Sequence, residues 1–79
     1  MDKIDVELLK KVEHCSGAQV SEVLALARGL RSETQLRTRL NALEFLGHVV
    51  QDRKSEAGKV FVAITQSGRE VLGGERIGR

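Results

Sequence analysis

The hydrophobic positions in the first part of the chain recur at steps of three and four residues, which is the period of an amphipathic α-helix. Over residues 2–14 they fall at Ile4, Leu8, Leu9 and Val12. The break at residues 16–17 is followed by Ser21, a favourable N-cap for a second helix that reaches about Arg28. The pattern therefore predicts two short helices, over residues 2–14 and 21–28.

A third helix is marked at both of its ends. Ser32, with Gln35 three residues later, has the form of a capping box, in which both side chains bind backbone N–H groups of the first turn. Gly47 suits the left-handed residue that ends a helix. Between them, one apolar stripe is formed by Leu36, Leu40 and Leu43. We predict a helix over residues 33–46 that buries this stripe.

Beyond Gly47 the hydrophobic period changes from that of a helix to that of a β-strand. Two short runs rich in β-branched residues, Val49–Arg53 and Lys59–Ile64, flank the polar, glycine-containing segment KSEAG. This pattern predicts a β-hairpin. Thr65–Gly68 then turns the chain into a short helix that ends near Leu72.

The length of 79 residues limits the chain to one domain with one hydrophobic core. We assign residues 1–72 to this domain, and we predict that residues 73–79, with three glycines, are a flexible tail. Hydrophobic residues make up 41% and charged residues 30% of the chain, as in ordinary soluble proteins. Because no apolar run could span a membrane and no signal-peptide pattern is found, we expect a cytoplasmic protein without membrane contact.

The sequence contains no catalytic or metal-binding pattern. Cys15 is the single cysteine, and with His14 and His48 it does not have the spacing of a metal site. The chain has no glycine-rich phosphate loop and no nucleophile paired with a base. We therefore expect no enzymatic activity, no metal, no cofactor and no small-molecule ligand.

Charge is distributed unevenly, although the net charge is only +2. Residues 1–27 contain three basic and five acidic residues, whereas residues 28–59 contain seven basic and four acidic ones. A basic middle segment is the distribution expected of a protein that contacts nucleic acid on one side.

Two separated stretches of the sequence resemble a known family. The run LRTRLNALEFLGHVV, which starts at Leu36, is similar to the recognition helix of bacterial winged helix-turn-helix regulators of the MarR, PadR and ArsR type. The run VFVAITQSGREVL, which starts at Val60, is similar to the end of the wing and the following helix in these regulators. The resemblance covers Asp5–Leu72. It assigns no subfamily, because the chain has neither the additional dimerisation helices of MarR-like proteins nor the grouped cysteines and histidines of ArsR-like sensors.

The resemblance implies an α+β, mainly α, winged helix-turn-helix fold, in which a three-helix bundle precedes a two-stranded β-hairpin wing and a short C-terminal helix. It implies a small transcriptional regulator of bacterial or mobile-element type that binds double-stranded DNA, with helix 33–46 in the major groove and wing 49–64 on the flanking backbone or minor groove. We expect a homodimer, because one recognition helix seldom gives enough specificity. The alternative is a protein-interaction module that acts as an adaptor in a larger complex and binds no DNA.

The side of helix 33–46 opposite the leucine stripe carries side chains that can read base edges. Arginine can donate two hydrogen bonds to guanine, asparagine and glutamine can pair with adenine, and threonine offers a hydroxyl or a methyl group. The beginning of the helix suits a phosphate. The predicted recognition residues are Ser32, Thr34, Gln35, Arg37, Thr38 and Asn41, and the predicted DNA-backbone contacts are Arg31 and Arg39. The alternative is a solvated polar side, which any amphipathic helix has.

Three basic residues lie at or near the tip of the hairpin: Arg53, Lys54 and Lys59. In the winged-helix interpretation they contact the minor groove or its phosphates. The alternative is that these charges keep an edge hairpin soluble.

Phe45 lies in helix 33–46, but a helix that binds DNA does not require an aromatic residue at this position. It projects on the same side as Thr38 and Asn41, but near the end of the helix that leaves the groove. An exposed aromatic residue there indicates a protein contact, either a dimer interface or a partner protein. The alternative is that Phe45 packs under the wing or the final helix as part of the core.

Overall fold

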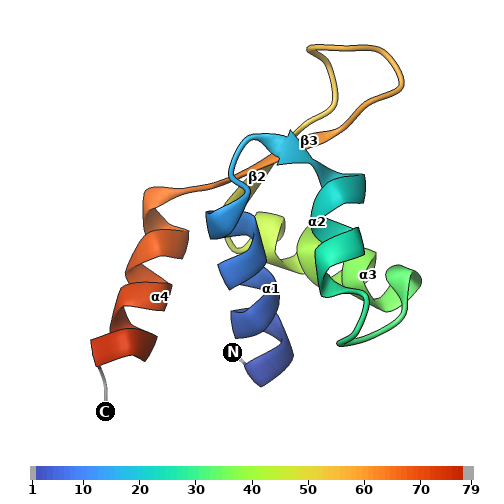
Figure 1. Ribbon diagram of the computed structural model, residues 1–79. Helices are drawn as coiled ribbons and strands as arrows, with labels where there is room; N and C mark the ends of the chain where they lie inside the picture. Colours follow the sequence, from blue (N-terminus) through green and yellow to red (C-terminus); the bar gives the residue numbers. More distant parts are fainter. Residues whose placement is uncertain (1, 78–79) are drawn as a thin grey trace.

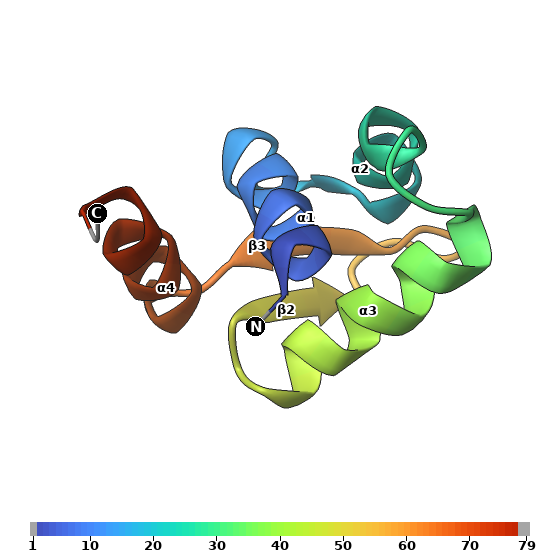
Figure 2. The same cartoon turned by 90° about the horizontal axis from the view of Figure 1, so that it is seen from below.

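Residues 2–77, which the computed structural model describes, form helices around a small antiparallel sheet (Figure 1). The elements in chain order are α1 (Lys3–His14), β1 (Ala18–Gln19), α2 (Val20–Ala27), α3 (Glu33–Phe45), β2 (Val49–Asp52), β3 (Phe61–Ile64) and α4 (Gln66–Ile77). α1 lies between α2 and α4 in both Figure 1 and Figure 2, and it packs on α2, α3, α4 and β3. The order of the helices and of the hairpin strands is the one that the sequence predicts.

The hydrophobic core lies where the helices meet the sheet, and every helix contributes buried residues to it. In α3, the predicted stripe of Leu36, Leu40 and Leu43 is confirmed, since none of the three side chains is more than 1% exposed. Burial of one such leucine stabilises the fold by about 1.5–3 kcal/mol relative to leaving it in water. The inner side of α3 is therefore occupied by packing, and only its outer side is available to a ligand.

The capping signals of α3 are also confirmed. Ser32 Oγ accepts a hydrogen bond from the backbone N of Gln35 at 3.3 Å, and Gln35 Oε1 accepts one from the backbone N of Ser32 at 3.4 Å. At the other end, Gly47 has a φ of +86°, a left-handed conformation that glycine adopts without a steric penalty. The helix ends at Phe45, with Leu46 as its C-cap.

A third strand, which the sequence does not predict, joins the hairpin. β1 pairs antiparallel with β3, and the sheet order is β1-β3-β2. The backbone N of Val20 donates to the carbonyl of Val60 at 2.8 Å, so this pairing holds the chain extended up to the first residue of α2. α2 therefore starts at Val20 with Gln19 as its N-cap, and the prediction that Ser21 is the N-cap is wrong.

The hairpin strands are shorter than predicted, because the chain leaves the β-ladder at Asp52. Asp52 Oδ1 accepts hydrogen bonds from the backbone N of Lys54 at 2.9 Å and of Ser55 at 3.1 Å, and these bonds turn the chain out of β2. The loop of the wing is consequently residues 53–60 rather than the predicted 54–58. It projects from the sheet at the top of Figure 1.

α4 is longer than predicted. It runs from Gln66 to Ile77, so the predictions of a turn over residues 65–68 and of a helix end near Leu72 are wrong. A glycine inside a helix costs about 1 kcal/mol, against about 3 kcal/mol for a proline, so the glycine pair at 73–74 does not stop the helix. Residues 78–79 of the predicted flexible tail lie outside the described residues.

The Thr-x-x-Gly pattern at the start of α4 fixes this helix to the sheet. Thr65 Oγ1 donates to the carbonyl of Gly47 at 2.6 Å and accepts from the backbone N of Gly68 at 3.1 Å. A Cβ atom at Gly68 would lie 2.3 Å from the carbonyl oxygen of His48. Gly68 therefore permits the backbone of α4 to approach the chain just before β2.

Candidate nucleic-acid interface

The side of α3 that faces away from the core carries the residues predicted to read DNA. The exposed residues of this side include Thr34, Gln35, Arg37, Thr38 and Asn41. Arg37 Nε pairs with Glu33 Oε2 at 3.0 Å, and the two side chains are 50% and 68% exposed. Such an exposed pair within a helix contributes about 0.3–0.5 kcal/mol, so Arg37 can exchange it for a ligand at little cost. Thr38 Oγ1 donates to the carbonyl of Thr34 at 3.1 Å, which uses its hydroxyl hydrogen within the helix.

Open depressions lie along this helix, and two of them are lined by predicted site residues. The first, at the beginning of α3, is lined by Arg31, Thr34, Gln35, Thr38 and Arg39. The second, between α2, α3 and the wing, is lined by Gln19, Val20, Ser21, Arg37, Gly58, Lys59 and Val60. It brings Arg37 of α3 and Lys59 of the wing together beside Ser21 at the beginning of α2. Two cations next to the N–H groups of a helix start suit an anion such as a phosphate. Ser21 and Gln19 were not among the predicted site residues.

Arg39 is bound within the molecule rather than presented to a ligand. Its Nη1 lies 2.8 Å from Asp2 Oδ2 and 3.1 Å from Asp5 Oδ1, both at the beginning of α1. The pKa of Asp2 is lowered mainly by the backbone N–H of Asp5 and then by the Arg39 guanidinium, and the pKa of Arg39 is raised by its hydrogen bonds to Asp2 and Asp5. Two carboxylates thus compensate the charge that was predicted to contact the DNA backbone.

A hydrogen-bonded network joins α3 to the wing, and its central residues, Glu44 and Gln51, were not predicted. Arg53 Nη2 lies 3.0 Å from Glu44 Oε1, and Arg53 Nη1 lies 3.3 Å from Glu44 Oε2. Gln51 donates to the same carboxylate twice, from its backbone N at 3.2 Å and from Nε2 at 3.0 Å. The Nε2 of Gln51 also donates to Asn41 Oδ1 at 2.9 Å. Two predicted site residues, Asn41 and Arg53, are therefore connected through Glu44 and Gln51.

The electrostatics of this network favour the ionised carboxylate. The pKa of Glu44 is lowered mainly by its hydrogen bonds from Arg53, with further contributions from Gln51. The pKa of Arg53 is raised by the same carboxylate. Glu44 therefore stays charged at neutral pH and acts as an acceptor only.

The three predicted wing cations differ in their surroundings. Arg53 is held by Glu44, and Lys59 Nζ pairs with Glu56 Oε1 at 3.0 Å across two exposed side chains. Lys54 is exposed, and among residues 2–77 its ammonium group has no hydrogen-bond or ion-pair partner. Of the three, Lys54 is the cation most available to an external anion.

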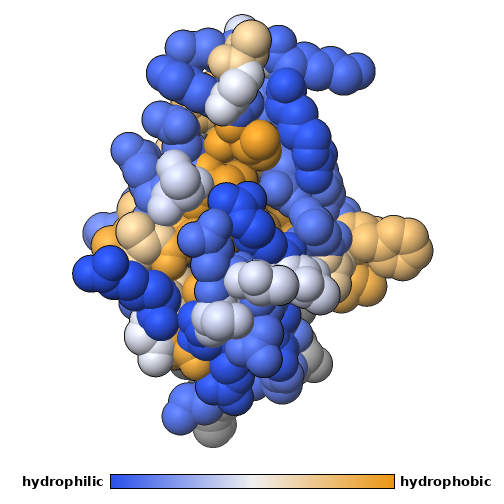
Figure 3. All heavy atoms as spheres, turned by 90° about the vertical axis from the view of Figure 1, so that its right-hand side faces the viewer, coloured by the Kyte–Doolittle hydropathy of each residue, from blue (hydrophilic) through white to orange (hydrophobic). Residues whose placement is uncertain are grey.

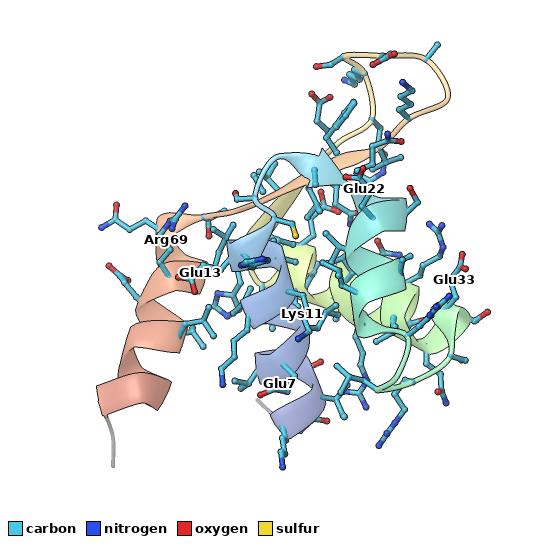
Figure 4. All side chains as sticks on the ribbon, in the orientation of Figure 1. Glu7, Lys11, Glu13, Glu22, Glu33 and Arg69 are labelled. Atoms are coloured by element: carbon cyan, nitrogen blue, oxygen red, sulfur yellow. The ribbon has the colours of Figure 1, made fainter. Side chains whose placement is uncertain are left out.

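Acidic side chains border the same surface. Glu22 projects from α2 and Glu33 from the beginning of α3, both on the right-hand side of Figure 4. They limit the positive potential of this side of the molecule, so charge attraction alone would give weak nucleic-acid binding.

Phe45 is exposed, which excludes the interpretation that it belongs to the core. Its side chain is 91% exposed, and its neighbour Leu46 is 60% exposed. Figure 3, with the wing at its top, shows a largely hydrophilic surface interrupted by hydrophobic areas, one of them at the right-hand edge. An apolar surface at the end of α3 is therefore available for contact.

Within residues 2–77, no group of three or more His, Cys, Asp or Glu side chains is placed to hold a metal ion. The helices of this part of the chain are also too short or too polar to cross a lipid bilayer.

The fold can be identified by comparison with solved structures, whereas no protein-family model and no curated protein sequence matches the chain. A crystal structure of Streptococcus pneumoniae FabT in complex with DNA superposes with a TM-score of 0.79 over 96% of this chain, at 17% sequence identity. The chain spans about half of the length of FabT, 52%. The likeness confirms the predicted α+β winged helix-turn-helix fold, with α2 and α3 as the helix-turn-helix and β2 and β3 as the wing.

Proposed function

We propose that this protein is a small transcriptional regulator that binds double-stranded DNA with sequence preference, with α3 in the major groove and the wing on the flanking backbone. The observation that carries the proposal is the composition of the outer side of α3. Threonine, arginine and asparagine side chains there, on a helix whose inner side is buried, are the groups that read base edges. FabT, which shares the fold, is in complex with DNA in its crystal structure.

The proposed contacts divide into base-reading and phosphate-binding groups. Arg37, Thr38 and Asn41 lie in the middle of the exposed side of α3 and would meet base edges. Arg31 and Ser32 at the beginning of α3, and Lys54 in the wing, would bind backbone phosphates. We do not include Arg39 or Arg53 as direct contacts, because each is held by a partly buried carboxylate, Asp5 or Glu44, whereas the pair of Arg37 with Glu33 is exposed.

We further propose that the protein binds as a homodimer, since one recognition helix seldom gives enough specificity. Two copies related by a twofold axis would occupy half-sites about 34–36 Å apart, one turn of the DNA helix. The exposed Phe45 and Leu46 are a candidate apolar contribution to a protein contact of this kind.

The proposal is tested by titrating the protein against a fluorescent random-sequence duplex at several salt concentrations. We expect binding at low salt that weakens steeply, by about 0.9 in the slope of log K against log salt for each phosphate contacted. A protein that binds no duplex even at low salt would contradict DNA binding.

A second candidate function is that of an adaptor that binds a protein partner instead of DNA. Phe45 favours it, because a 91% exposed aromatic side chain is unusual for a surface that serves only DNA. The same titration separates the two functions, since an adaptor would show no salt-dependent duplex binding.

A further inference from the structure

The network between α3 and the wing determines which end of the Asn41 side chain faces outward. Gln51 follows Val49 by two residues on β2, so both side chains lie on the same face of the sheet; Val49 is buried and Gln51 partly buried. β2 is also an edge strand of the sheet. The backbone N–H of Gln51 is bound by Glu44 of α3 rather than by another strand. Gln51 is therefore fixed to α3 by its main chain as well as by its side chain.

The direction of the hydrogen bonds follows from the chemistry of Glu44. An ionised carboxylate only accepts, so the Gln51 carboxamide must turn its nitrogen, its only donor, toward Glu44. That same Nε2 carries a second hydrogen, which is donated to Asn41 at 2.9 Å. The atom of Asn41 that receives it must be the oxygen, Oδ1. Glu44 thus orients Gln51, and Gln51 in turn orients Asn41.

The other end of the Asn41 carboxamide, Nδ2, is consequently left for an external ligand. Asn41 is exposed, and among residues 2–77 its Nδ2 has no hydrogen-bond partner. Asparagine that pairs with adenine uses both its oxygen and its nitrogen, because adenine presents the N7 acceptor beside the N6 donor. Guanine presents two acceptors, N7 and O6, which match the N–H groups of Asn41 Nδ2, whereas the Asn41 oxygen is directed toward Gln51 of β2.

We propose that Gln51 is a positioning residue that makes Asn41 a hydrogen-bond donor toward DNA, so that Asn41 selects guanine rather than adenine at the base it contacts. The inference rests on the proposed DNA-binding function and specifies the base that one residue reads. It changes the simple expectation that an asparagine on a recognition helix reads adenine.

The test is selection of preferred sites from a randomised duplex pool by wild-type protein, Asn41→Ala, Gln51→Met and Val50→Ala. Asn41→Ala identifies the position read by residue 41, where it removes the base preference. We expect wild type to prefer guanine over adenine at that position by about 5- to 150-fold, the range of one good side-chain contact to a base. Gln51→Met keeps the length of the side chain but has no hydrogen-bond donor. The Asn41 carboxamide can then rotate and exchange the positions of its oxygen and nitrogen, so the guanine preference falls to less than about twofold or changes to adenine.

The control, Val50→Ala, changes an exposed residue of the same strand and should keep the guanine preference. Circular dichroism of each variant checks that the fold is intact. Adenine or a pyrimidine selected by wild type, no position affected by Asn41→Ala, or an unchanged guanine preference in Gln51→Met would each overturn the inference while leaving DNA binding in place. Failure of the proposed function itself would appear differently, as wild-type protein that recovers no duplex at low salt.

Discussion

At the scale of single residues, Gly68 shows why a position without a side chain can determine how elements meet. A Cβ atom there would lie 2.3 Å from the carbonyl oxygen of His48 and 2.7 Å from Ile64 Cγ1, and both neighbours are in the packed region where α4 meets the sheet. The backbone oxygen cannot rotate away as the end of a flexible side chain could. The helix would have to move, and with it the contact between α4 and the start of β2.

We predict that Gly68→Ala lowers the free energy of unfolding by about 1–3 kcal/mol, the usual cost of overpacking. Gly74→Ala is the matched control, because Gly74 is also in α4 but has no atom within 4 Å of the Cβ position. This control should leave stability unchanged or raise it by up to about 1 kcal/mol, since alanine favours the helix. Urea denaturation measures both values. Equal stability of the two variants would show that the close approach at Gly68 is unimportant.

Residues whose partners are near in the sequence were predictable, and those with distant partners were not. The capping box of Ser32 and Gln35 spans three residues, and it could be read directly from the sequence. Arg39, by contrast, was predicted to contact DNA because its local surroundings are basic. Its partners Asp2 and Asp5 lie 37 and 34 residues away, and only the packing of α1 on α3 brings them together. The sequence also did not determine whether the Phe45 side chain is exposed, since its exposure depends on where the wing and α4 lie.

At the scale of elements, long periodic segments were predicted well and short ones were not. The hydrophobic stripe of α3 repeats over two turns, whereas β1 has two residues, too few to show any period. Because the sequence did not predict β1, the predicted start of α2 was wrong: pairing of β1 with β3, rather than a serine cap, sets that boundary. The link between α3 and β2 also escaped prediction, since it joins residues of different elements through Glu44.

We predict that Glu44 stabilises the fold in a pH-dependent way. Its pKa is lowered in the folded protein from the ordinary value of 4.5, so its contribution is present above about pH 4.5 and is lost as the pH falls below that value. Glu44→Gln lacks this titration. The stability difference between wild type and Glu44→Gln, measured by urea denaturation from pH 7 to pH 3, should therefore be largest at neutral pH and shrink in acid.

The comparison isolates Glu44 from the other acids. Asp2 and Asp52 also have lowered pKa values, and both remain in the variant, so acid destabilises the two proteins alike through these residues. A difference that stays constant between pH 7 and pH 3 would contradict a role for the ionised carboxylate in joining α3 to the wing.

At the scale of the whole molecule, the proposed interface combines two types of contact that respond differently to mutation. The net charge is only +2, and several cations near the interface are paired with acids of the same chain. Nonspecific attraction should therefore be modest, and sequence preference should come from the exposed side of α3. Arg37 belongs to the base-reading group and Lys54 to the phosphate-binding group.

The central claim is that α3 reads base edges while the wing binds backbone phosphates. It is tested most directly by comparing the binding of Arg37→Ala and Lys54→Ala to a selected duplex and to a random duplex at several salt concentrations. Arg37→Ala should weaken binding to the selected duplex by about 1–3 kcal/mol and affect the random duplex less. Lys54→Ala should weaken both alike and reduce the slope of log K against log salt by about 0.9. If both variants bind both duplexes as wild type does, neither α3 nor the wing contacts DNA, and the proposed interface is wrong.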